Sequence, residues 1–214
     1  MILHLKINFG KWFLYVFLRD RCTRLFNLCT LKGMKIGLIG RNGSGKSVVC
    51  EWFGSQGFHV TSLSDEIRRE AERQQRPLDR DTLTEISNQL KAADGMGVLA
   101  QRAIEFTQQY HQVVFDSIRH PDEVRILKAH GVVFIGVDAE LAIRYQRVLD
   151  RKRDTDFVDF ETFKRQDEAE FSGLRPAQNI KACWAYCDIV IDNNQSDKAA
   201  LFAAVEQAVT AWID

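Results

Sequence analysis

The sequence predicts an α/β protein in which helices cover both faces of a five-stranded parallel sheet. Short runs of Val, Ile and Phe alternate with longer segments of helical periodicity, which is the pattern of βαβ units. The apolar runs are continuous rather than alternating, as expected for strands that are buried on both faces. A chain of 214 residues with 45% hydrophobic and 27% charged residues is also typical of one globular domain.

The predicted elements follow one another along the chain without an interdomain linker, a repeat or a low-complexity tract. The strands are Lys35–Ile39, His59–Ser62, Val113–Phe115, Val132–Val137 and Ile189–Ile191. The helices are Ser47–Phe53, Asp65–Arg76, Thr82–Tyr110, Pro121–His130, Ala139–Arg151, Asp159–Glu170 and Asp197–Trp212. The first strand leads directly into a glycine-rich segment, and the third is followed by a carboxylate.

The first 33 residues differ from the rest of the chain. They carry six basic side chains against one acid and show no clear periodicity. Their longest apolar run, Trp12–Leu18, is shorter than the roughly 18 residues of a membrane span, and no small-residue cleavage site follows it. Because Met34 opens the first strand, we expect 34–214 to be the domain and 1–33 to be an extension foreign to the native protein. A membrane-surface anchor and a packed extension are the alternatives.

A phosphate-binding motif follows the first strand. Gly40-Arg41-Asn42-Gly43-Ser44-Gly45-Lys46-Ser47 matches G-x-x-x-x-G-K-[ST] in full. Glycines allow the backbone to fold around an anion, and the N-terminus of the next helix adds positive potential. We expect residues Gly40 to Val48 to bind ATP, with Lys46 on the β- and γ-phosphates and Ser47 on Mg²⁺. The alternative is a chance glycine-rich turn, but the strand and helix around the motif favour a three-layer P-loop NTPase fold.

An aspartate follows the third strand. Asp116 is placed as a carboxylate that organises Mg²⁺ should be, and the alternative is an aspartate that only caps a turn. Ser117 stands next, where ATPase motors commonly carry a glutamate, which favours phosphoryl transfer to a substrate over hydrolysis. Motifs of guanine-binding switches and of ABC-type ATPases are absent from the sequence.

Composition excludes several other classes. The formal net charge is zero, so no general attraction to nucleic acid or to a membrane is expected for 34–214. The five cysteines form no C-x-x-C pair and indicate neither a disulfide framework nor a zinc site. Five scattered histidines have no metal-ligand spacing. We therefore expect a cytoplasmic protein, monomeric or homodimeric.

The chain from Met34 onward resembles the P-loop nucleotide kinases, the group of adenylate, dephospho-CoA and deoxynucleoside monophosphate kinases, and within it an uncharacterised archaeal branch. The resemblance rests on the P-loop and on two later segments, Ser64-Asp65-Glu66-Ile67-Arg68 and Asp116-Ser117-Ile118-Arg119. It implies that Arg68 and Arg119 bind the acceptor's phosphate and that Asp65 orients or deprotonates the attacking group. The second segment departs from the kinase pattern at Ser117, which leaves the acceptor open. The alternative for the first segment is that it is an ordinary helix N-terminus with Ser64 as its N-cap.

The resemblance also implies a helical lid. Arg144, Arg147 and Arg151 fall at i, i+3 and i+7, one stripe of a helix, and Arg153 follows. In related kinases such arginines close over the transferring phosphates, where they neutralise developing charge. Arg147 and Arg151 are the best candidates for this catalytic role. The alternative is a solvated helix face with local pairs to Asp150 and Asp154.

Together these interpretations predict a kinase. It would use ATP and Mg²⁺ to phosphorylate a small phosphorylated acceptor, most simply a (deoxy)nucleoside monophosphate. A dephospho-CoA kinase-like enzyme that acts on a hydroxyl is the first alternative. A regulatory protein that binds ATP without turnover is the alternative from another class.

Overall fold

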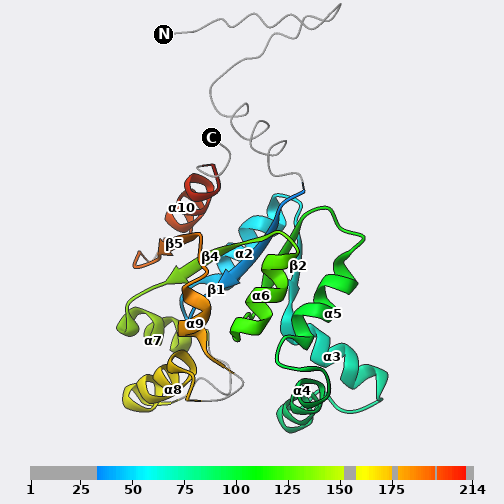
Figure 1. Cartoon of the computed structure of the whole chain (residues 1–214). Helices are drawn as coiled ribbons and strands as arrows, with labels where there is room; N and C mark the ends of the chain where they lie inside the picture. The colour runs from blue at the N-terminus through cyan, green and yellow to red at the C-terminus, as the bar shows by residue number, and fades with distance from the viewer. Residues whose placement is uncertain (1–32, 152–157, 175–177, 196, 211–214) are drawn as a thin grey trace, which may run out of the picture. The chain divides into compact units, whose positions relative to one another are not determined.

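The computed structural model describes residues 33–151, 158–174, 178–195 and 197–210 (Figure 1). The predicted extension 1–33 lies outside the described residues except for Gly33, so its role stays a prediction. None of the described helices has both the length and the apolar composition that a membrane span requires.

The sheet has five parallel strands in the order β2-β3-β1-β4-β5. The strands are β1 (Lys35–Ile39), β2 (His59–Ser62), β3 (Val113–Asp116), β4 (Val132–Asp138) and β5 (Ile189–Asp192). Each contains a strand predicted from an apolar run, so the predicted fold class is confirmed. The central strands β1, β3 and β4 are almost entirely buried. The edge strand β5 is partly exposed, with Val190 at the surface.

Helices cover both faces of the sheet (Figure 1). They are α2 (Lys46–Ser55), α3 (Leu63–Arg73), α4 (Arg80–Asp94), α5 (Val98–Thr107), α6 (Pro121–Ala129), α7 (Leu141–Asp150), α8 (Phe160–Ser172), α9 (Ile180–Trp184) and α10 (Lys198–Thr210). Helices α2 and α10 pack together on one face, and α5, α6 and α9 cover the other. The pairs α3/α4 and α7/α8 extend beyond the carboxyl ends of the strands on two sides.

The prediction of one long helix over Thr82–Tyr110 is wrong. The chain breaks at Gly95 and Gly97 into α4 and α5. Gly95 ends α4 with a φ of +87°, a conformation that a side chain disfavours, and Gly97 is the N-cap of α5. Because apolar residues continue through the break, the periodicity hides it. The short helix α9 was not predicted at all.

Candidate phosphate-transfer site

The loop between β1 and α2 carries the predicted P-loop residues. Gly43 and Gly45 have φ angles of +78° and +106°, which residues with a side chain rarely adopt. A Cβ on Gly43 would also lie 2.5 Å from the carbonyl oxygen of Arg144. Glycine at these positions therefore allows the loop to curve tightly beside α7.

Helix α2 begins directly after this loop and has no side-chain cap. Its N-cap is Gly45, and its first turn holds no acidic residue. Helices α3 and α4, in contrast, are capped by the side chains of Ser62 and Asp79. The first-turn amides of α2 therefore remain suited to an anionic ligand, which the helix dipole would also attract.

Lys46 folds back over the loop. Its Nζ donates hydrogen bonds to the carbonyl oxygens of Gly40 at 2.7 Å and of Arg41 at 2.9 Å. Burial lowers the pKa of Lys46 below its ordinary value, while the nearby carboxylate of Asp116 opposes this shift and the nearby guanidinium of Arg119 adds to it. The ammonium thus lies within electrostatic range of Asp116, which ends β3, and of Arg119, which follows it.

Asp116 lies at the carboxyl end of β3, beside β1. Ser117 follows with a φ of +63°, and its hydroxyl hydrogen bonds with the Ser62 hydroxyl at 2.9 Å. Ser117 Oγ lies 3.5 Å from Asp116 Oδ2. The other carboxylate oxygen, Asp116 Oδ1, is buried and has no hydrogen-bond partner among the described residues. Such an oxygen is costly to leave unpaired, so Asp116 fits a cation ligand.

Ser47 and Asp116 are the side chains that could take part in holding the expected Mg²⁺. Within the described ranges, no group of three or more His, Cys, Asp or Glu side chains could hold a metal ion. Ser47 is exposed in the first turn of α2, and Asp116 supplies one unpaired oxygen. Mg²⁺ commonly binds through one or two protein side chains, with phosphates and water as the other ligands.

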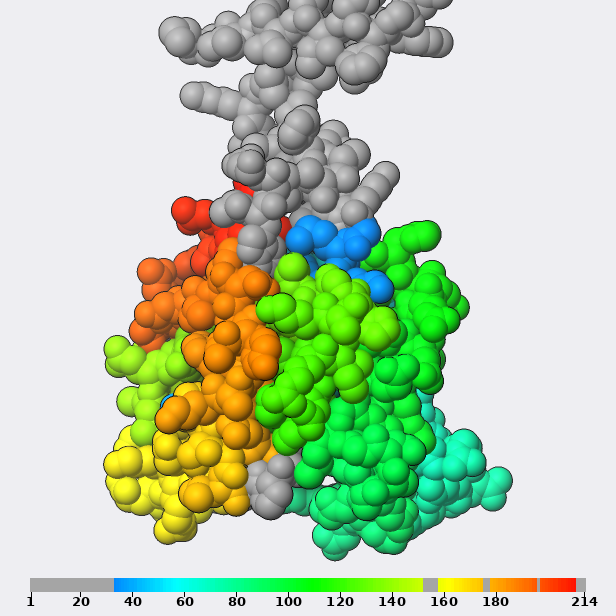
Figure 2. All heavy atoms as spheres, in the orientation of Figure 1, coloured from blue at the N-terminus to red at the C-terminus, as the bar shows by residue number. Residues whose placement is uncertain are grey.

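A cavity of about 520 Å³ lies between α3, α4 and the turn after β3. Arg68 and Arg119, the two predicted acceptor-binding arginines, both line it, together with Arg80 and Lys91 of α4. In the space-filling view, α4 lies at the lower edge of the described part of the chain (Figure 2). The structure therefore brings the two predicted arginines to one basic cavity.

One acidic side chain, Glu123, lines the same cavity. It is 2% exposed, and its Oε2 accepts hydrogen bonds from the backbone N–H groups of Arg119 at 2.8 Å and His120 at 3.0 Å. Burial raises the pKa of Glu123 above its ordinary value, although these hydrogen bonds oppose the shift. Glu123 thus holds the turn that presents Arg119.

Asp65 belongs to the start of α3. Its Oδ2 accepts a hydrogen bond from the backbone N–H of Ser62 at 3.0 Å, and its Oδ1 accepts one from Arg68 at 2.8 Å. Ser62, rather than Ser64, is the N-cap, in a complete capping box with Asp65. Both carboxylate oxygens are therefore engaged within α3, and Asp65 is not among the residues that line the cavity.

Arg144 is buried and is not part of a solvated stripe. Its guanidinium forms a bidentate pair with Asp167 of α8, at 2.5 and 2.9 Å, and also donates to the carbonyl oxygen of Asn42 at 3.3 Å. Arg41 Nη1 lies 3.3 Å from Asp167 Oδ2, and the Arg41 guanidinium lies over the ring of Phe171. Asp167 thus joins the P-loop, α7 and α8. Its sequence position carries no signal of this role.

The other predicted lid arginines lie at the end of α7. Arg147 Nη2 donates to the carbonyl oxygen of Gln195 at 2.7 Å, whereas its Nη1 is buried without a partner among the described residues. Burial lowers the pKa of Arg147 below its ordinary value. Arg151 ends α7 at the surface, and Arg153 lies outside the described residues. The lid role of these arginines stays a prediction.

Asn193 is a structural partner of the P-loop that sequence reasoning did not assign. It follows β5, is buried, and its Nδ2 donates to the carbonyl oxygen of Ser44 at 2.8 Å. Its backbone N–H bonds to the carbonyl oxygen of Asp138 at 2.8 Å. The only sequence signal is its place after a strand, which an ordinary turn residue would share.

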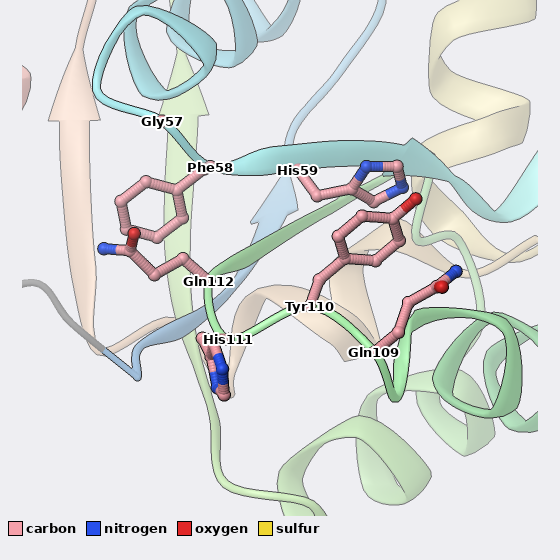
Figure 3. A pocket seen from close by; sticks show the side chains of 7 residues that line it. All are labelled: Gly57, Phe58, His59, Gln109, Tyr110, His111 and Gln112. Carbon is pink, nitrogen blue, oxygen red and sulfur yellow. The ribbon is translucent and has the colours of Figure 1, made fainter.

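A separate hollow of about 470 Å³ lies where β2 and β3 begin (Figure 3). The Tyr110 ring stacks on His59 there, with ring centroids 3.7 Å apart. The P-loop instead follows the carboxyl end of β1. Ligands of open parallel sheets bind at the carboxyl ends of the strands, so the functional site is assigned to the P-loop edge.

These features define a P-loop protein with a kinase-like fold, and solved structures agree. TT1252 from Thermus thermophilus matches with a TM-score of 0.58 and 22% identity, over 85% of this chain and 97% of that one. A shikimate kinase from Acinetobacter baumannii matches with a TM-score of 0.58 and 15% identity, over 86% and 97%. At these identities, the similarity shows the fold alone.

The chain belongs to the archaeal UPF0200 family. It is 30% identical over 143 residues to a UPF0200 protein of Pyrococcus furiosus, an alignment that covers 63% of this chain and 77% of that protein. It is 32% identical over 169 residues to a UPF0200/UPF0201 protein of Archaeoglobus fulgidus, covering 75% of this chain but only 50% of that protein. No protein-family model matches the chain.

Proposed function

We propose that this protein is a kinase that transfers the γ-phosphoryl group of ATP to a small phosphorylated acceptor, most simply a nucleoside monophosphate. The observation that carries the proposal is that the basic cavity adjoins the P-loop edge of the sheet, because Ser117, which lines the cavity, has its Oγ 3.5 Å from Asp116 Oδ2. Arg119 lines the basic cavity and also lies close enough to Lys46 to lower its pKa. A donor phosphate on the P-loop and an acceptor in the cavity would therefore meet beside Asp116.

The residues on the two sides have complementary tasks. The uncapped amides of α2 and the Lys46 ammonium would hold the donor phosphates. Arg119 would hold the acceptor, so that an acceptor oxygen lies in line with the γ-phosphorus. The bond from that phosphorus to the β,γ-bridging oxygen breaks as its bond to the acceptor oxygen forms, and ADP leaves. Mg²⁺, held by Ser47 and Asp116, would supply neutralisation of the phosphate charge.

The hydrogen bonds that Asp65 already accepts support a phosphate acceptor over a hydroxyl acceptor. A hydroxyl nucleophile needs a base to take its proton, and Asp65 was the candidate. Both of its oxygens are engaged at the start of α3. A phosphate oxygen is already ionised at neutral pH and needs no base, which suits a cavity rich in arginine and lysine.

The test is an acceptor screen. Purified protein is incubated with ATP, Mg²⁺ and each of the common nucleoside monophosphates or dephospho-CoA, and the phosphorylated products are separated by chromatography. Lys46→Ala should lower kcat/KM by about 100-fold or more, because about 3 kcal/mol of transition-state stabilisation is lost. Lys128→Ala, an exposed change on α6, is the matched control.

The outcomes separate the candidate functions. A diphosphate product from a monophosphate supports the proposal. Phosphorylation of dephospho-CoA alone indicates the hydroxyl-directed alternative. Binding of ATP and Mg²⁺ without acceptor-dependent ADP formation across the whole panel contradicts the kinase and indicates a regulatory protein.

A further inference from the structure

One face of α4 lines the basic cavity along most of the helix. The residues of this face follow the helical spacing of three or four and are Arg80, Leu83, Thr84, Ser87, Asn88 and Lys91. The helix places Thr82, Ile86 and Leu90 in the protein interior instead. Apart from Leu83, which packs against the core, this face is polar and partly exposed, so it is available to a polar ligand that enters the cavity.

Lys91 is the unusual member of this face. It is half-buried, and its ammonium forms no hydrogen bond or ion pair in the part of the chain that the structure describes. Burial lowers its pKa below the ordinary value; the nearby Glu123 opposes this shift and the nearby Arg119 adds to it. Two cations thus approach one another at the cavity wall, and the one acid beside them is occupied by backbone amides.

Arg68, which lines the cavity from α3, differs from Lys91 because it already has an ion-pair partner. Its guanidinium is already paired with Asp65 at 2.8 Å. The Arg119 side chain, in contrast, has no hydrogen-bond or ion-pair partner within the described ranges. Lys91 is half-buried and Arg119 is exposed, and two cations that lie close together are both stabilised when an anion binds between them. Arg80, at the exposed start of α4, also has no side-chain partner among the described residues, but Lys91 and Arg119 are the two that lie close to each other, so an anion would bind best between these two.

We propose that Lys91 and Arg119 form the subsite for the acceptor's phosphate group, and that the polar face of α4 contacts the rest of the acceptor. Describing the ligand as an acceptor rests on the proposed kinase function, but the anion subsite does not. The bound group is a phosphate monoester, and Lys91 is a binding residue that sequence reasoning did not single out. Arg68 would take a supporting place on the far wall.

Chemical labelling tests the subsite without relying on turnover. The protein is treated briefly with acetic anhydride in the presence of AMP, inorganic phosphate or adenosine, and each lysine is quantified by peptide mass spectrometry. AMP and phosphate should slow acetylation of Lys91 by about tenfold at saturation, and adenosine should not. Lys128 should be unaffected by all three, whereas ATP with Mg²⁺ should protect Lys46.

Substitution gives an independent readout. Lys91→Met should weaken AMP binding in calorimetry by about 10-fold or more and leave ATP binding unchanged, because the lost contact is a charge-assisted hydrogen bond. Lys91→Arg, which keeps the charge, should retain most of the affinity, and Lys128→Met should behave as wild type. If turnover is found, the Lys91→Met effect should fall on the KM for the acceptor rather than for ATP.

The two proposals can fail separately. Protection of Lys91 by AMP without any kinase activity would support the subsite and contradict the kinase. Kinase activity with no protection of Lys91, and an unchanged acceptor KM in Lys91→Met, would overturn the subsite and leave the kinase in place. Retained ATP binding by Lys91→Met shows that the variant is folded.

Discussion

Removing Asp167 should destabilise the protein strongly, because two arginines at the flank of the P-loop share its carboxylate. Arg144 forms the bidentate pair at 2.5 and 2.9 Å, and Arg41 lies at 3.3 Å. The Arg144 and Asp167 side chains are 1% and 6% exposed. Asp167→Ala would leave the buried Arg144 guanidinium with two carbonyl partners and with the more distant Asp138 carboxylate, 3.7 Å from its Nε. Removing one member of a buried ion pair typically costs about 3–5 kcal/mol.

Urea denaturation measures this loss. With a slope of about 1–3 kcal/mol per M, a loss of about 3–5 kcal/mol in Asp167→Ala should lower the unfolding midpoint by about 1–5 M. Arg144→Met should cost less, because Asp167 keeps Arg41 as a partner and the methionine fills part of the space. The double variant should be less destabilised than the sum of the two single variants, because it leaves no unpaired Arg144 charge.

Arg165→Met on the same helix is the control for this series. Its guanidinium is exposed and, among the described residues, hydrogen bonds only to the Thr162 hydroxyl, so the cost of this substitution should stay within about 0.5 kcal/mol. The reasoning is refuted if Asp167→Ala costs less than about 1 kcal/mol, or if the effects of Asp167→Ala and Arg144→Met are simply additive.

Two further predictions concern titration and thiol reactivity. Hydrogen bonds, chiefly from Arg73, lower the pKa of Glu70 to about 2. The stability that the ionised Glu70 contributes is present above the ordinary carboxyl pKa and is lost as the pH falls. Between about pH 5 and pH 2, the urea midpoint should therefore fall more steeply in wild type than in Glu70→Gln. Parallel curves for the two proteins would contradict the lowered pKa of Glu70. Burial raises the pKa values of Cys50, Cys183 and Cys187 to about 12. At neutral pH, iodoacetamide should therefore modify these three cysteines at least about tenfold more slowly in the folded protein than in urea. Peptide mass spectrometry measures the modification. Fast labelling of any of the three in the folded protein would be inconsistent with its burial.

The elements that sequence could predict depend on residues close together in the chain. The P-loop is a contiguous motif whose glycines and lysine act within one turn, and the strand before it is a single apolar run. Asp116 at the end of β3, and Arg119 shortly after it, could also be predicted, because both lie close to an apolar strand in the sequence. Where local patterns continue through a boundary, prediction failed, as at Gly95 and Gly97.

The site's long-range partners could not be predicted in this way. Asp167 meets Arg144 across 23 residues, and Asn193 reaches Ser44 across 149. Nothing in the local sequence distinguishes these residues from ordinary surface polar groups. The helical spacing of Arg144, Arg147 and Arg151 was correct, but spacing alone does not say which residue faces the interior.

The sequence alone predicted a P-loop on a parallel α/β sheet, because the P-loop pattern and the buried strands are local properties of the chain. Only the tertiary structure decided which cations remain unpaired. Arg144 pairs with Asp167 and Arg68 with Asp65, whereas Lys91 and Arg119 face a shared cavity and have no side-chain partner among the described residues. The reason is physical: charge compensation depends on distances between elements, and these are established only when the helices pack.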